Sequence, residues 1–405
     1  MSRASSKRTL ATCCAAHTLH DGLSDCSYVL LPILAQTFNL SLAQAGLIRS
    51  AWRAATALFQ TPAGLMAERL GARNLLAFGT ACAGLAFIAL GQSAGFAAIL
   101  LALFCAGFGS AFQHPLCSTL ISHAYPGDGR RAALGTYNFF GDVGKFAFGG
   151  AVSLLFVAGV PWQVPVTVYG SLALACALVI LLLMHETAGR AHAAAALANA
   201  GAPVTGWGIR NRRGFIALCL IEIIDSTTRN GFLTFIAFLM LAKNLPAGWA
   251  ALSVPLILIG GMAGKLACGF LAERFGIVRT VAVTEIATGV GILSMLVLPD
   301  IAAYLVLPLV GVAVNGTSSV LYATIGDLVE KDRLPRAFGL FYTLGSICGL
   351  IAPLVFGVIG DALGVGTSIA LSGFLPFLTL PLCLMLGLGK AGDVYPGSGK
   401  TGARG

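Results

Sequence analysis

Apolar stretches of about 20 residues recur along the chain from about residue 15 to about residue 388, with short polar breaks between them. A helix needs roughly 20 predominantly apolar residues to cross the hydrocarbon core of a bilayer. Of the 405 residues, 57% are hydrophobic and only 10% are charged, a composition far from that of water-soluble globular domains. We therefore expect an all-α membrane protein whose solvent is largely the lipid bilayer.

Polar breaks divide the sequence into about twelve expected spans in two groups of six. The spans are expected at residues 15–38, 43–66, 74–92, 96–122, 131–158, 162–184, 214–242, 248–272, 279–298, 302–328, 336–360 and 366–388. The longest break, 185–212, is rich in alanine, glycine and polar residues and is expected to be a cytoplasmic linker. The predicted organisation is a six-helix bundle over 1–184, this linker, a second bundle over 213–390 and a tail over 391–405.

Basic residues lie in alternate breaks. Arginines follow the second, fourth and sixth spans, whereas the loops 38–45 and 91–97 carry no charge. The positive-inside rule then places both termini and the linker in the cytoplasm, as in a multi-pass protein of a bacterial inner membrane. The net charge of +9 follows this pattern, so nucleic acid is not an expected partner.

An eight-residue motif, G-x-x-A-E-R-x-G, occurs twice at a separation of 205 residues. Each copy closes the second span of its half, and internal duplication of this kind is typical of secondary transporters. The residues expected to form a gating loop are Gly64, Glu68, Arg69, Gly71 and Arg73 in the first copy and Gly269, Glu273, Arg274 and Gly276 in the second.

This duplicated loop resembles the signature of the major facilitator superfamily, and the resemblance covers essentially the whole chain. It implies about twelve transmembrane helices in two pseudo-symmetric six-helix bundles. It also implies that Glu68 docks against the cytoplasmic end of the eleventh span and holds an outward-open state. Residues 107–115, residues 137–144 and the run Gly339 to Phe341 resemble fosmidomycin resistance proteins, which implies efflux of a drug or toxic metabolite.

Charged residues inside the spans mark the expected functional site. A charge at mid-bilayer costs at least about 2.5–3.5 kcal/mol, so such residues normally pair around an aqueous cavity. Asp25 and Arg53 each lie roughly 15 Å from the start of their span, near the middle of the membrane, and could pair. The residues expected to form a substrate or proton pathway are Asp21, Asp25, Arg49, Arg53, Asn138, Asp142, Lys145, Glu222, Asp225, Arg229 and Asn315.

Two further charges, Lys265 and Glu285, lie nearer the cytoplasmic ends of their spans and are interpreted mainly as structural. With them included, six intramembrane carboxylates face five bases, so one acid is expected to remain free to bind and release a proton. The leading hypothesis is a monomeric secondary transporter of a small-molecule substrate that works by alternating access. We expect it to be proton-coupled and to export its substrate, without a cofactor or bound metal.

Three alternatives remain open. Arg49, Arg53, Lys145 and Arg229 could bind a carboxylate or phosphate, and Leu103 stands where drug/proton antiporters carry an arginine, which favours an importer of a small organic anion or nutrient. A copper transporter would use soft or imidazole ligands, here His17, His20, Cys26, Met240 and Met262, although their spacings do not converge on one face. A membrane receptor that does not transport is a third class. An enzyme is not expected, because the sequence contains no hydrolase elbow, nucleotide-binding loop or metalloprotease motif.

Overall fold

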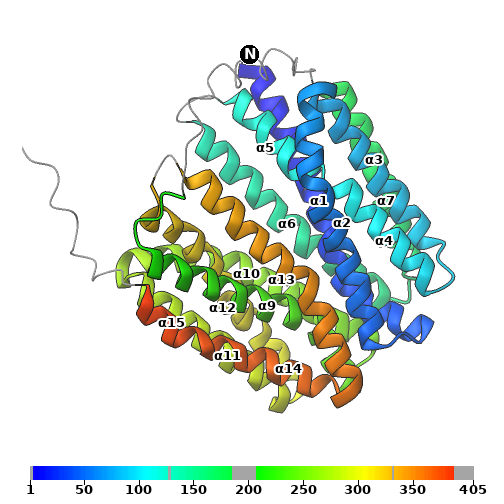
Figure 1. Ribbon diagram of the computed structural model, residues 1–405. Coiled ribbons are helices and arrows are strands. Elements are labelled where there is room, and N and C mark those ends of the chain that lie inside the picture. Colours follow the sequence, from blue (N-terminus) through cyan, green and yellow to red (C-terminus); the bar gives the residue numbers. More distant parts are fainter. Residues whose placement is uncertain (1–2, 126–128, 185–206, 331–332, 387–405) are drawn as a thin grey trace, which may run out of the picture.

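The computed structural model describes residues 3–125, 129–184, 207–330 and 333–386, and this part of the chain is almost entirely helical (Figure 1). Helices suit a lipid environment because they satisfy every backbone N–H and C=O group within the segment. The one β-bridge in these ranges joins Ile209 to Val329. Residues 185–206 of the expected linker and the whole expected tail, 391–405, lie outside the described residues.

The first half of the chain forms one bundle and the second half another (Figure 1). The first comprises α1 (Arg3–Phe38), α2 (Leu42–Leu70), α3 (Ala72–Gly91), α4 (Phe96–Ser110), α5 (Gln113–Ala124), α6 (Gly129–Val157) and α7 (Gln163–Leu183). The second comprises α9 (Arg212–Ala242), α10 (Ala247–Phe275), α11 (Ile277–Val297), α12 (Asp300–Leu328), α13 (Leu334–Leu363), α14 (Val365–Phe374), the 3-10 helix η2 (Leu375–Leu378) and α15 (Thr379–Met385). Because α4 with α5, and α14 with η2 and α15, each form one span, the expected all-α fold of twelve spans is confirmed.

Nine spans in the described chain are long and apolar enough to cross a membrane by length and composition. The other three are α1, α2 and α9. These helices carry charged side chains in mid-span, among them Asp25, Arg53 and Asp225, and such side chains lower the mean hydropathy. The helices with the weakest membrane signal are thus the ones that carry most of the expected functional charges.

The two copies of the duplicated motif adopt the same backbone conformation. Gly71 ends α2 with φ +86° and Gly276 ends α10 with φ +86°, a region that favours glycine because it has no Cβ. In each copy the glycine N–H donates to the carbonyl four residues earlier, that of Ala67 or Ala272. The sequence repeat therefore corresponds to a structural repeat.

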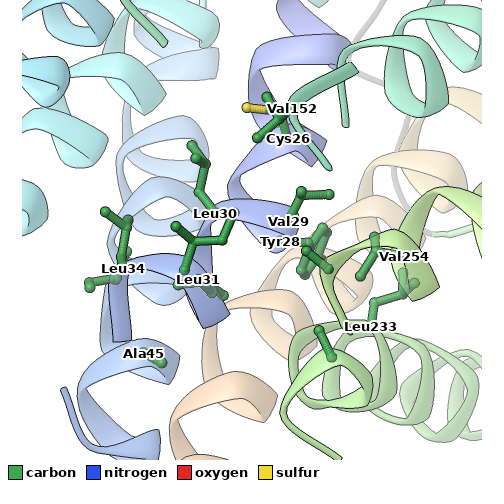
Figure 2. Packing of buried hydrophobic residues seen from close by; sticks show 14 of the residues in the cluster. Cys26, Tyr28, Val29, Leu30, Leu31, Leu34, Ala45, Val152, Leu233 and Val254 are labelled. Carbon is green, nitrogen blue, oxygen red and sulfur yellow. The ribbon is translucent and has the colours of Figure 1, made fainter. Parts of the chain in front are cut away.

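Apolar packing differs between the two ends of the molecule. At the end where α1 finishes and α2 begins, one continuous cluster of buried side chains joins the two bundles. Figure 2 shows part of it, with Val29 and Tyr28 of α1 beside Leu233 of α9 and Val254 of α10. At the end where the chain begins, each bundle has a separate cluster among the described residues. The bundles are therefore sealed together at the first end, which we call the closed end, and packed separately at the other, which we call the open end.

Candidate functional site

A cavity of about 360 Å³ lies between the bundles and borders the shared apolar cluster at the closed end. Tyr28, Trp52 and Leu233 belong to both the cluster and the cavity wall. Most other lining residues are polar or charged, and they come from α1, α2, α4, α5 and α6 on one side and α9, α10, α12 and α13 on the other. The cavity is therefore a polar compartment at the interface of the two halves.

Asp21 of α1 is the centre of a charged cluster on the first bundle. Its carboxylate lies 3.2 Å from His17 Nε2, 3.5 Å from His114 Nε2 and 3.2 Å from Lys145 Nζ. The side chain of Asp21 is 10% exposed, so these partners replace most of its hydration. The cluster joins α1, α5 and α6 around one carboxylate.

The His17 ring is fixed in position beside Asp21. Its Nδ1 lies 2.8 Å from the Tyr137 carbonyl oxygen, which can only accept, so Nδ1 carries a hydrogen. Its Nε2 then faces the Asp21 carboxylate at 3.2 Å. The ring stacks on Tyr137 at a centroid distance of 4.0 Å, which fixes its orientation.

Asp142 of α6 links the two bundles. Its carboxylate lies 2.9 Å from Lys145 Nζ on the same helix and 2.7 Å from Lys265 Nζ on α10. Among the described residues, this Asp142–Lys265 contact is the one ion pair that crosses between the bundles. Lys265, which the sequence interpretation treated mainly as structural, thus lines the cavity and bridges its two walls.

Arg49, rather than Arg53, is the partner of Asp25. Arg49 is 1% exposed, lies 3.5 Å from Asp25 Oδ1, and donates to the Ser24 carbonyl and the Ser27 hydroxyl. Its guanidinium also stands 3.7 Å above the Tyr28 ring. The expected Asp25–Arg53 pair is therefore wrong, because Arg49 reaches these backbone and hydroxyl acceptors on α1 as well as the carboxylate.

Arg53 lines the cavity without a carboxylate partner among the described residues. Its Nε is buried and receives no hydrogen-bond acceptor there. The nearby acids are already occupied, Asp25 by Arg49, Asp21 by Lys145 and the histidines, and Asp142 by two lysines. This leaves Arg53 as a partly exposed cation at the cavity wall, with no described carboxylate beside it and a buried Nε without an acceptor.

The second bundle contributes an acidic group around Arg229 of α9. Arg229 lies 3.5 Å from Asp225 and donates to the Ser226 hydroxyl, which in turn donates to Glu222 Oε1. Glu285 of α11 is fully buried beside Asp225. Three carboxyl groups therefore lie near one guanidinium, and Asp225 is the one in direct contact with it.

The remaining expected site residues are placed less centrally. Asn315 lines the cavity and donates to the Gly311 carbonyl. Asn138 is exposed and does not line this cavity, so the structure does not bring it to the other expected site residues. Sequence reasoning omitted His17 and His114 from the pathway, although residues 107–115, which contain His114, carry part of the family resemblance.

The signature loops lie at the open end. The side chains of Glu68 and Arg69 are outside the described part of the structure. Arg73 donates to the Met184 carbonyl of its own bundle, Glu273 is exposed, and Arg274 stacks on Phe275 at 5.5 Å. A Cβ added at Gly64 or Gly269 would meet nothing within 4 Å. These observations leave the gating role implied for the loops as an expectation.

The copper ligands named as an alternative do not converge. Both His20 nitrogens are hydrogen-bonded to Ser110 and Thr80, and Cys26 and Met240 lie in the apolar cluster. A different group, His17, Asp21 and His114, holds its ligand atoms within 4.8 Å of one another. The Lys145 ammonium beside Asp21 competes with any cation there.

Comparison with known proteins decides the family. The profile described as Major Facilitator Superfamily matches residues 13–353 and again 266–400. The chain belongs to the major facilitator superfamily. It is accordingly a multi-pass membrane transporter and not an enzyme.

The fold is similar to that of a bacterial homolog of the human lysosomal transporter Spinster in an inward-facing and occupied conformation. The TM-score is 0.78 at 17% sequence identity, and the match covers 95% of this chain and 97% of that one. The nucleoside transporter NupG gives a TM-score of 0.76, 14% identity and coverage of 94% and 100%.

Curated relatives within this superfamily are distant. The chain is 26% identical to the "Gentisate transporter" of Corynebacterium glutamicum over 40% of its own length and 38% of that protein. It is 25% identical to the "Uncharacterized MFS-type transporter YfnC" of Bacillus subtilis over 89% and 88%. It is 23% identical to the "Probable sulfoacetate transporter SauU" of Cupriavidus necator over 83% and 83%. These relatives do not confirm the narrower resemblance to fosmidomycin resistance proteins.

Proposed function

We propose that this transporter carries a small organic anion together with protons across a bacterial inner membrane, with its termini in the cytoplasm. The observation that carries the proposal is Arg53, a partly exposed arginine that lines the cavity, has no described carboxylate partner and has a buried Nε without an acceptor. A carboxylate or sulfonate of the substrate would supply the missing acceptor, and guanidinium groups bind such planar or branched oxyanions with two parallel hydrogen bonds.

The names of two relatives fit this charge, since gentisate and sulfoacetate are both organic anions. The shape of the cavity fits alternating access, in which two bundles rock around a central site. With the orientation indicated by the basic loops, the open end faces the cytoplasm and the structure represents an inward-open state. Export remains the expectation of the fosmidomycin resemblance alone, and no contact among the described residues favours it over uptake.

The test is uptake of labelled carboxylates and sulfonates by purified protein in liposomes. A screen of aromatic and sulfonated carboxylates identifies the substrate, and Arg53→Gln is then compared with the wild type. Loss of a charge-assisted contact is expected to weaken apparent affinity about 10- to 100-fold. Arg130→Gln changes an exposed arginine at the open end and serves as the matched control. Unchanged affinity in Arg53→Gln, or transport of cations and not anions, would contradict the proposal.

A further inference from the structure

We infer that Asp225 and Glu285 share the coupling proton. When this proton is bound, Arg229 exchanges its ion pair with Asp225 for an ion pair with the substrate anion. The inference rests on the proposed function, because it specifies how an anion carrier would be coupled to protons. It gives Glu285 of α11 a functional role, whereas the sequence analysis interpreted this residue mainly as structural. Four structural arguments support the inference.

The first step is the state of Glu285. Its side chain is 0% exposed, and neither carboxyl oxygen receives a hydrogen bond from an N–H or O–H donor among the described residues. The hydroxyl of Thr317, which lies beside it, donates to Thr284 instead. Its neighbour is the Asp225 carboxyl, 3% exposed. Two carboxylate oxygens are both acceptors, so this contact becomes a hydrogen bond only when one of them carries a proton.

The second step is the surrounding charge. The ionisable side chains that face this acidic group from the packed helices are Cys219, Glu222 and Arg229 of α9, Tyr322 of α12, Tyr342 and Cys348 of α13, Cys383 of α15, Lys265 of α10 and Tyr28 of α1. Arg229 is the cation in ion-pair contact with the group, since Lys265 is held by Asp142. If all three carboxyl groups were ionised, one guanidinium would leave a net charge of −2 buried in the bundle. Such a charge is costly, so we expect the group to hold at least one proton in the conformation that the structure represents.

The third step is the route between this pair and the cavity. Glu222, Ser226 and Arg229 border the cavity, whereas Asp225 and Glu285 lie behind them. The Ser226 hydroxyl joins Arg229 to Glu222 through two hydrogen bonds of 3.0 and 2.9 Å. Glu222, three residues before Asp225 on α9, is thus the carboxyl group of this acidic group that borders the cavity. Because Asp225 and Glu285 lie outside the apolar cluster of the closed end, a proton exchanged with the cavity would not have to cross that cluster.

The fourth step is the coupling. When the shared proton leaves, the charge on Asp225 holds Arg229 in its ion pair. When the proton is present, Arg229 is bound less tightly and its guanidinium, already at the cavity wall, can bind the substrate anion. Proton and anion then favour each other's binding, and linkage makes this effect reciprocal. A carrier of this kind is a symporter, so an inward proton gradient would drive uptake.

The experiment compares wild type, Glu285→Gln and Asp225→Asn in liposomes with the membrane potential clamped to zero. Anion exchange at equal pH on both sides measures the carrier itself, and accumulation driven by an inward pH gradient measures coupling. For one proton per monovalent anion, a one-unit gradient is expected to give about tenfold accumulation in the wild type. Glu285→Gln is expected to retain exchange and to lose accumulation. Asp300→Asn, which removes a partly exposed carboxylate remote from the cavity, is the matched control.

The outcomes separate the two proposals. Absence of anion exchange by the wild type would refute the proposed function itself. Exchange together with unaltered pH-driven accumulation in both variants would overturn the proton-site assignment and leave the anion carrier intact. If neither variant folds, a pH-indicator dye in weakly buffered detergent solution tests the wild type alone. Addition of the transported anion is expected to withdraw about one proton per protein from solution, and no proton uptake would refute the coupling.

Discussion

At the scale of single residues, the Asp21 cluster depends on the absence of a side chain on α6. A Cβ added at Gly141 would lie 2.5 Å from the His17 ring and 2.9 Å from Asp21 Oδ2. His17 cannot turn aside freely, because its Nδ1 is held by the Tyr137 carbonyl and its ring is stacked on Tyr137. Gly141 is therefore what lets α1 and α6 approach with a histidine and an aspartate between them.

Gly141→Ala tests this requirement. We expect overpacking to displace His17 and to lower the free energy of unfolding by about 1–3 kcal/mol, with a loss of transport. Gly150→Ala on the same helix is the control, because its Cβ would lie 3.9 Å from Pro255, an ordinary contact. The control is expected to stay within about 0.5 kcal/mol of the wild type. Denaturation in detergent measures both variants, and equal stability of the two would contradict this account of the cluster.

The residue pairings are where sequence reasoning failed. Helical spacing correctly placed Arg49 and Arg53 one turn apart on α2, and composition showed that acids and bases were nearly balanced. Which arginine reaches Asp25 depends on the relative rotation and height of α1 and α2. Those quantities are set by packing between helices and leave no signal in either segment alone. The proximity of Glu285 to Asp225 was not predicted for the same reason, since the two residues are on different helices.

At the scale of secondary-structure elements, the closed end is fastened by a carboxylate that caps a helix of the other bundle. Asp361, in the last turn of α13, accepts hydrogen bonds of 2.8 and 2.9 Å from the backbone N–H groups of Leu42 and Ala43, the first residues of α2. An anion at this position also gains from the helix dipole. One side chain thus satisfies two N–H groups that would otherwise have no partner within α2.

Asp361→Ala is expected to loosen this contact. Loss of an N-terminal cap costs about 0.5–2 kcal/mol, which corresponds to roughly 2- to 30-fold faster opening of the capped amides. Hydrogen exchange followed by mass spectrometry measures this in the peptide that contains Leu42 and Ala43. Asp300→Ala, which removes a carboxylate at the start of α12, is expected to leave that peptide unchanged. Equal protection in both variants would mean that Asp361 does not fasten the two bundles.

Sequence alone predicted these elements well and their interruptions poorly. Apolar runs between polar breaks located the twelve spans because the bilayer demands a length of apolar helix that few other structures share, although α1, α2 and α9 carry the weakest signal. It did not detect that residues 111–112 break one span into α4 and α5, or that η2 separates α14 from α15. Such breaks are local changes of backbone hydrogen bonding inside segments of uniform polarity. A hydropathy scale, which measures only polarity, therefore does not detect these breaks.

At the scale of the whole molecule, the conformational state lies in the interface between the bundles. Gly46 of α2 is so close to α13 at the closed end that a Cβ would meet the Pro353 carbonyl oxygen at 2.2 Å. At the open end a Cβ at Gly64 of α2 or Gly339 of α13 would meet nothing within 4 Å. The same helices are thus in contact at one end and apart at the other. No sequence pattern could predict which end is sealed, because both states use the same helices and the same apolar faces.

If the bundles alternate, the open faces of α2 and α13 must close against each other when the cavity opens to the other side. A bulky side chain at Gly64 should then obstruct closure without touching the cavity. We expect Gly64→Phe to bind the transported anion with wild-type affinity in detergent and to transport it at least about tenfold more slowly, since a steric cost of 1.4 kcal/mol in the closed state suffices for that factor. Gly366→Phe on α14, where a Cβ would also meet nothing within 4 Å, is the matched control and should transport normally. Wild-type transport by Gly64→Phe would mean that these faces do not close, and that the cavity exchanges its contents by a route other than rocking of the two bundles.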